Sequence, residues 1–297
     1  MSLPFLSVVV PTMRVGGLDV LTHGLRGQVF RDFELVLVDA LRDLRGHALD
    51  EEEYQVTHVA PVDNPFPLNA FCRYANTGLL HARGEIVVFV TDYTYLPPDC
   101  LQRHAQFHAS HDFVEALMCP HQYLGLPPLR SSFPTYKQSE VERYALDVEA
   151  GKLDDCMWTI FQKEFSRADA DSLPLDAIYG WADPKMKMGS GPIDPTFFHA
   201  KNESVRREHV NAIDGWDEQL DHAHCYQDSD LADRLSTLRG VRWILDQTNV
   251  AYIVNPRTVF CFPKRERNES DNERIWHERK AAGYPGRVDS ILREGSD

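Results

Sequence analysis

Short apolar runs alternate with amphipathic stretches over the first 120 residues of this 297-residue chain, and this alternation restricts the fold more than any other feature. Strands are predicted where β-branched and aromatic residues cluster, at Ser7–Val10, Phe33–Val38, Gln55–Ala60 and Glu85–Val90. Helices are predicted between them, around Leu18, Leu21 and Leu25 and over Asn69–Ala82. Such alternation predicts an α/β fold with a mainly parallel central sheet, helices on both faces and a ligand crevice at the carboxyl ends of the strands.

Charge and composition exclude several classes of protein. The chain carries 31 Lys and Arg residues against 45 Asp and Glu residues, a formal net charge of −14, which argues against a broad nucleic-acid or anionic-membrane surface. Apolar runs such as Ile86–Val90 are far shorter than the ~18 to 20 residues of a membrane-spanning helix, and the N-terminus lacks a secretory pattern. The six cysteines are scattered, which indicates reduced thiols. We therefore expect a cytoplasmic protein without an integral membrane segment.

The remaining chain is expected to complete one domain and add a short extension. Residues 1–120 and 121–262 are predicted to form two halves of the same domain, and residues 263–297 a C-terminal helical extension. Prolines interrupt most of the segment from 121 to 196, and regular structure returns near Phe197. Asp99, which follows two prolines, is expected to cap a helix.

Three aspartates stand where predicted elements begin or end. Asp39 ends an apolar strand and could bind a nucleobase or ribose, or cap a turn. Asp92 follows the fourth predicted strand, where a carboxylate suits a divalent cation with phosphate co-ligands, although a single aspartate is a weak metal motif. Asp228 and Asp230 begin a helix, so they could be caps, or Asp228 could be a general base for a hydroxyl nucleophile.

Several segments between residues 5 and 240 follow one another in a characteristic order. They are Ser7–Thr12, Gln28–Asp39, Asn76–Gly78 with Ala82–Glu85, Thr91–Asp92 with Leu96–Pro98, Asn202 with Arg206–Glu208, Gly215–Glu218, and Gln227–Leu231 with Arg234 and Leu235. This order resembles the family-2 glycosyltransferases, whose catalytic domain has the GT-A fold, a nucleotide-binding α/β sandwich.

The resemblance implies a role for particular residues. Asp228 would be the catalytic base, and Asp92 would hold a divalent cation, Mn²⁺ or Mg²⁺, on the diphosphate of a nucleotide sugar. The implied donor-binding residues are Pro11, Thr12, Arg14, Asp39, Arg73, Asn76 and Asp92. The implied acceptor-binding residues are Trp181, Asn202, Trp216 and Asp217.

The chain departs from the family pattern at both acidic motifs. The metal-binding loop reads Thr91-Asp92-Tyr93, without the usual outer carboxylates, so metal dependence stays open. Gln227 replaces the acidic neighbour of the proposed base. A late histidine that often completes the metal shell has no equivalent near Asn255.

Acceptor recognition is expected in the middle of the chain. Trp158, Tyr179 and Trp181 could stack on sugar rings or fill a second small core, while Lys185 and Lys187 suit anionic groups. His222 and His224 could bind a metal or the acceptor, or be solvated.

The resemblance implies an inverting glycosyltransferase that uses a nucleotide-sugar donor and a saccharide or lipid-linked acceptor. A UDP-sugar is the expected donor, because uridine-linked donors are common in the family. A nucleic-acid acceptor is not expected, given the acidic charge. Two alternatives are a sugar nucleotidyltransferase and a non-catalytic sugar-nucleotide-binding protein. A Rossmann oxidoreductase is not supported, because no G-x-G-x-x-G follows the first strand.

Overall fold

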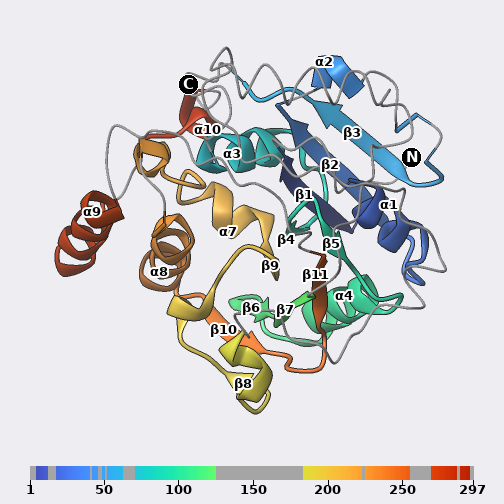
Figure 1. The fold of residues 1–297 in the computed structure, drawn as a ribbon. Coiled ribbons are helices and arrows are strands. Elements are labelled where there is room, and N and C mark those ends of the chain that lie inside the picture. Colours follow the sequence, from blue (N-terminus) through green and yellow to red (C-terminus); the bar gives the residue numbers. More distant parts are fainter. Residues whose placement is uncertain are drawn as a thin grey trace.

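The computed structural model describes residues 5–12, 18–40, 42–45, 49–50, 52–62, 71–124, 183–222, 225–254, 269–285 and 288–294. Eight strands form the main sheet: β1 (Leu6–Thr12), β2 (Phe33–Asp39), β3 (Gln55–Val59), β4 (Ile86–Val90), β6 (Glu115–Met118), β8 (Gly191–Pro192), β9 (Asn202–Arg206) and β10 (Arg242–Leu245). Their order is β3-β2-β1-β4-β9-β6-β10-β8 (Figure 1). A smaller sheet contains β5 (Thr94–Tyr95), β11 (Ala251–Val254) and β7 (His121–Leu124), in that order.

The main sheet is mostly parallel. β1 runs parallel to β2 and β4, β2 to β3, and β6 to β10. β9 is antiparallel to its neighbours β4 and β6, and β8 is antiparallel to β10. The predicted α/β class with a mainly parallel central sheet is therefore confirmed.

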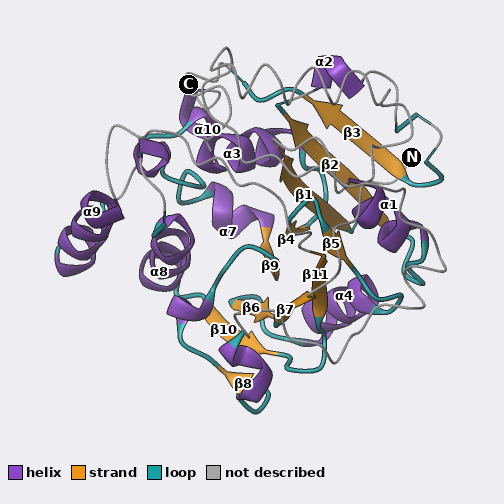
Figure 2. Ribbon diagram, in the orientation of Figure 1, coloured by secondary structure: helices purple, strands orange, loops and turns teal. Residues whose placement is uncertain are grey.

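Helices cover both faces of this sheet (Figure 2). The helices are α1 (Leu18–Arg26), α2 (Arg42–Arg45), α3 (Phe71–His81), α4 (Cys100–Ser110), α7 (Arg207–Asn211), α8 (Gln227–Arg239), α9 (Glu269–Ala281) and α10 (Ile291–Glu294), with 3-10 turns η1 (Pro184–Lys187), η2 (Pro195–Phe197) and η3 (Glu218–His222). Within β1, Val8 and Val10 face α1 and α4, whereas Val9 faces α3, α7 and α8. This alternation is the period-two pattern of a strand buried on both faces.

The early strands and helices agree with the sequence prediction to within a few residues, whereas β6, β7, β10 and β11 were not predicted. The prediction for Asp99 was wrong in detail. Asp99 precedes α4, but its side chain makes no capping hydrogen bond. Its carboxylate instead accepts a 2.8 Å hydrogen bond from Arg103 Nε one turn further on.

No helix in these described segments is long and apolar enough to cross a lipid bilayer. Cys72, Cys100 and Cys119 are buried free thiols.

Gly78 allows α3 to lie unusually close to the sheet. A Cβ atom at this position would come within 2.4 Å of Val9 Cγ1, closer than carbon atoms can approach. The contact brings the whole of α3 against β1 and β2, so a side chain here would move the helix.

β9 is a polar strand in the middle of the sheet. Asn202, Glu203 and Ser204 are all fully buried. His104 and His108 of α4 each lie 2.8 Å from Ser204 Oγ, and His104 Nε2 lies 3.0 Å from Asn202 Oδ1. Because buried polar groups are costly unless they are hydrogen-bonded, these histidines make the polar strand tolerable in the core.

We expect the two histidines to make the fold acid-sensitive. Burial lowers the pKa of His104 to about 4 and that of His108 to about 3. An unfolded histidine titrates near about pH 6.5, so between roughly pH 6.5 and 4 the unfolded chain binds protons that the folded chain rejects. As the pH is lowered through this window, the free energy of unfolding should decrease by up to about 1.4 kcal/mol per pH unit for each histidine.

Urea unfolding between neutral pH and pH 5 measures this slope. A His104→Gln/His108→Gln double variant should show a smaller slope, and the exposed His277→Gln should serve as the control. Equal slopes in the double variant and the parent would contradict the assignment.

Candidate active site

Three of the predicted donor-binding residues meet at the carboxyl edge of the sheet. Thr12 ends β1, lies in register with Asp39 at the end of β2, and donates a 2.6 Å hydrogen bond from Oγ1 to Asp92 Oδ2. Asp92 follows β4, which pairs with the other side of β1. Pro11, one residue before Thr12, lies in register with Val38. The hydrogen bond from Thr12 fixes the orientation of the Asp92 carboxylate.

Asp39 has a partner that the sequence did not suggest. His58 Nε2 lies 2.9 Å from Asp39 Oδ2, and the Asp39 carboxylate is fully buried. His58 comes from β3, the neighbour of β2. The contact therefore links the ends of two parallel strands at this edge.

The second half of the chain reaches the same edge through β9. Because β9 is antiparallel to β4, with Val90 opposite Asn202, the beginning of β9 lies where β4 ends. Lys201 therefore lies beside the segment that carries Asp92. The carboxyl edge of the first half and the start of β9 form one site.

Asp228, in the first turn of α8, belongs to this neighbourhood. Burial raises its pKa to about 7, the nearby cations Lys201 and Lys185 oppose that shift, and Glu203 adds to it. The residue is only partly buried, so it can be reached. A carboxylate with a pKa near 7 is suited to accept a proton at neutral pH. Asp228 therefore lies near the start of β9, and its role as a base stays a prediction.

A buried charged pair supports the start of β9. Lys185 Nζ lies 2.5 Å from Glu203 Oε1 and 3.5 Å from Asp183 Oδ2, and all three side chains are buried. Glu203 Oε2 also accepts hydrogen bonds from the backbone N–H groups of Lys201 and Asn202. The Lys185 ammonium is thus paired with buried carboxylates, contrary to the expectation that it binds an anionic ligand. Lys187 is exposed.

Asn76 holds two parts of the core together, and the donor-binding prediction for it was wrong. Its Oδ1 accepts a 2.8 Å hydrogen bond from Trp216 N, and its Nδ2 lies 2.8 Å from both Trp216 O and Glu218 Oε1 and 3.0 Å from Ser290 Oγ. The side chain is fully buried. Because it is fully buried and bound to these core partners, Asn76 cannot contact a donor.

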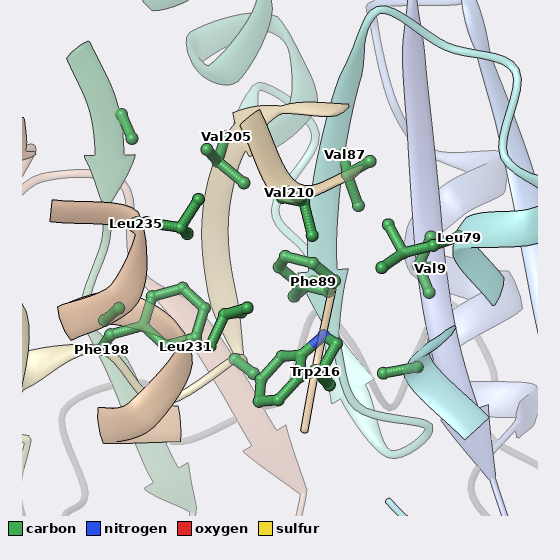
Figure 3. Close-up of a cluster of buried hydrophobic side chains, with 14 of the residues drawn as sticks. Val9, Leu79, Val87, Phe89, Phe198, Val205, Val210, Trp216, Leu231 and Leu235 are labelled. Atoms are coloured by element: carbon green, nitrogen blue, oxygen red, sulfur yellow. The ribbon is translucent and has the colours of Figure 1, made fainter. Parts of the chain in front are cut away.

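Trp216 is a core residue, so its predicted contact with the acceptor was also wrong. The indole is fully buried and packs edge-on against Phe89, with ring centroids 5.6 Å apart (Figure 3). It also packs edge-on against Phe71, with centroids 4.9 Å apart. The neighbouring Asp217 is buried in an ion pair with Arg279 of α9, which excludes its predicted acceptor role.

Asn202 likewise has a structural role in place of the predicted acceptor contact. Its Oδ1 faces His104, and its Nδ2 donates to the backbone carbonyls of Pro120 and Asn249 at 3.3 and 2.8 Å. The side chain joins α4 to the loops before β7 and β11 and cannot reach a ligand.

Arg73 lies at the start of α3 and remains partly exposed. Its guanidinium forms a 2.7 Å ion pair with Glu218 Oε2, and its exposed fraction is 20%. Asp221 accepts the backbone N–H groups of Cys72 and Arg73 and so caps this helix end. Several predictions lie outside the described residues: those for Arg14, Trp158, Tyr179, Trp181, His224, Asn255 and the side chain of His222.

One group in the described part of the chain combines three side chains able to hold a metal ion. Ligand atoms of His121, Asp183 and His199 lie within 4.8 Å of one another. Asp92 belongs to no such group of three among the described residues. No sequence motif indicated this cluster, because its members come from separate segments.

No protein-family model matches the sequence, and no curated protein matches it. Solved structures do resemble the fold. The mannosyltransferase PcManGT from Pyrobaculum calidifontis, in complex with GDP-Man and Mn²⁺, has a TM-score of 0.51 at 19% identity over 86% of this chain and 59% of that chain. TarS from S. aureus, residues 1–349, has a TM-score of 0.49 at 15% identity over 84% of this chain and 60% of that chain.

The chain thus spans about three fifths of the length of these two structures. At this level of identity the likeness to PcManGT establishes the fold alone. The predicted GT-A type of α/β sandwich is confirmed, and the roles of individual residues stay predictions.

We expect Asn76→Ala to destabilise the protein by roughly 2–4 kcal/mol, because the buried Trp216 N–H and the Glu218 carboxylate would each lose a partner. Asn211→Ala, on the exposed surface of α7, is the matched control and should change the free energy of unfolding little. Denaturant unfolding of both variants tests this. Equal stability of Asn76→Ala and the parent would contradict a structural role for Asn76.

Proposed function

We propose that this protein is an inverting glycosyltransferase of the family-2 type, which moves a sugar from a nucleotide-diphosphate donor to an acceptor hydroxyl. Two observations support the proposal: Thr12 orients the carboxylate of Asp92 just after β4, and the partly buried Asp228 interacts with Lys201, which precedes β9 next to the end of β4. In this proposal Asp92 holds a cation on the leaving diphosphate, and Asp228 accepts the proton of the incoming hydroxyl.

The donor would bind over the ends of β1, β2 and β4. In this proposal Pro11 and Thr12 line the nucleotide pocket, Asp39 with His58 meets the base, and Arg14 and Arg73 lie toward the phosphates. The structure of PcManGT with GDP-Man and Mn²⁺ supports a nucleotide sugar as the donor class. Within that class, a UDP-sugar is the donor that the family resemblance implies.

A divalent cation, Mn²⁺ or Mg²⁺, held by Asp92 would stabilise negative charge on the departing phosphates. A carboxylate is a suitable type of ligand for this cation, because such ions prefer oxygen ligands. It contributes one ligand, and Thr91 and Tyr93 on either side contribute no further carboxylate.

The reaction would be a single displacement. Asp228 takes the proton of the acceptor hydroxyl as its oxygen attacks the anomeric carbon from the face opposite the diphosphate. The bond between that carbon and the diphosphate oxygen breaks, and the nucleoside diphosphate leaves with the electron pair. One displacement inverts the anomeric carbon. Lys201 and Lys185 lie near Asp228 and oppose the effect of burial on its pKa, so a fraction of the Asp228 carboxyl groups is ionised at neutral pH.

Residues 1–120 would then be the nucleotide-sugar half, residues 121–262 the acceptor and catalytic-base half, and residues 263–297 a helical extension containing α9 and α10. Trp181 is the proposed stacking residue for a saccharide or lipid-linked acceptor.

We expect Asp228→Asn to fold and bind donor normally and to lose at least about a hundredfold in turnover, because an amide cannot take the proton. In the parent, turnover should rise with pH through about 7, since the carboxyl must be ionised to act as a base and its pKa is raised to about 7. Release of nucleoside diphosphate from UDP- and GDP-sugars measures both effects. Asp112→Asn, an exposed residue before β6, is the control.

Unchanged turnover in Asp228→Asn would remove this residue from the base role. Pyrophosphate release from a nucleoside triphosphate would favour the nucleotidyltransferase, and binding without turnover would favour a non-catalytic protein.

We expect Asp92→Ala to weaken donor binding by at least about tenfold and to abolish any effect of Mn²⁺ on that affinity, because the oriented carboxylate is lost. Calorimetric titration of the nucleotide sugar with and without Mn²⁺ measures this. Asp99→Ala, an exposed aspartate of a surface ion pair, is the control. The same affinity and the same Mn²⁺ response as the parent would exclude Asp92 from the donor site.

A further inference from the structure

Three segments that are distant in sequence converge next to the start of β9. His121 begins β7, Asp183 precedes η1, and His199 stands just ahead of β9. Ligand atoms of all three lie within 4.8 Å of one another. His121 and Asp183 are buried, whereas His199 is partly exposed. The cluster therefore has a closed side and a side open to solvent.

The contacts within the cluster already orient its members. Asp183 Oδ2 lies 3.0 Å from His121 Nδ1 and accepts a 3.0 Å hydrogen bond from the backbone N–H of the same histidine. Asp183 Oδ1 accepts the backbone N–H of Lys185. The two imidazole rings of His121 and His199 stand perpendicular, with centroids 5.5 Å apart. Each ring is thus held in a defined position relative to the carboxylate.

The local charge favours a cation despite the neighbouring Lys185. The ammonium of Lys185 lies closer to Glu203, at 2.5 Å, than to Asp183, at 3.5 Å. Glu203 therefore balances the lysine, and the negative charge of Asp183 is left over. Imidazole nitrogens are common ligands of divalent transition metals.

We propose that His121, Asp183 and His199 bind a divalent transition-metal ion of the zinc class. Two imidazoles and one carboxylate are a ligand set that such ions accept, and three protein ligands leave a position for water. Mg²⁺ is a poor fit, because it prefers an all-oxygen shell. This site shares no ligand with the one proposed at Asp92, and it does not depend on the proposed function.

Such an ion would connect segments that the chain itself leaves far apart. His121 and Asp183 are separated by 62 positions, and His199 leads directly into Lys201 and β9. A metal bound only by the folded chain stabilises it by mass action. It would also hold the start of β9, and so the surroundings of Asp228, in place.

The experiment uses the full chain, stripped of metal by a chelator and titrated separately with Zn²⁺, Co²⁺ and Mg²⁺. We expect one Zn²⁺ per chain, a rise in melting temperature with Zn²⁺, and visible absorption of bound Co²⁺, whereas Mg²⁺ should cause neither change. His199→Ala should weaken Zn²⁺ binding by more than the roughly 10- to 100-fold that loss of a merely supporting residue causes. His199 is partly exposed, so this variant is expected to fold, and circular dichroism checks that it does.

His277→Ala, an exposed histidine of α9, is the matched control and should bind Zn²⁺ like the parent. Absence of saturable Zn²⁺ binding, or equal affinity in His199→Ala, would overturn the proposal and leave a hydrogen-bonded His121–Asp183 pair. Neither readout involves sugar transfer, so the outcome is independent of whether the glycosyltransferase proposal stands.

Discussion

A polar strand can occupy the middle of a sheet only if every buried polar group on it finds a partner. β9 meets this condition through the imidazoles of α4, which face Asn202 and Ser204, and through Lys185, which neutralises Glu203. Without these partners the buried polar groups of β9, the strand between β4 and β6, would be left unsatisfied at a cost in stability. The two buried histidines of α4 are therefore part of the sheet's architecture.

The direction of β9 has a consequence for chemistry. Because it runs against β4, its first residues return to the edge where β1, β2 and β4 end. A parallel β9 would have placed Lys201 at the opposite edge, away from Asp92. The antiparallel pairing thus places the start of β9 beside the loop that carries Asp92.

The apolar strands and the aspartates at their ends were predictable from sequence. A strand pattern is local, and a buried apolar strand is followed by a polar loop. The central position of the polar strand β9 and the roles of Asn76, Trp216 and Asp217 were not. The partners of Asn76 lie 140 to 214 positions away in the chain, so no local pattern reveals that its amide is saturated. His58 and the cluster around Asp183 were missed for the same reason.

The residues that turned out to be structural still bear on Asp228. Asn76 fixes the turn at Gly215–Trp216 to α3, and Gly215 adopts the positive φ of 67° that this turn requires. Arg234, buried in α8, binds the carbonyl oxygens of Ile213 and Gly215 at 2.9 and 2.7 Å and pairs with Asp230. The helix that carries Asp228 is therefore tied to α3 through one turn. A buried residue that is fully hydrogen-bonded cannot touch a ligand, but in this arrangement it helps to fix the position of the helix that carries Asp228.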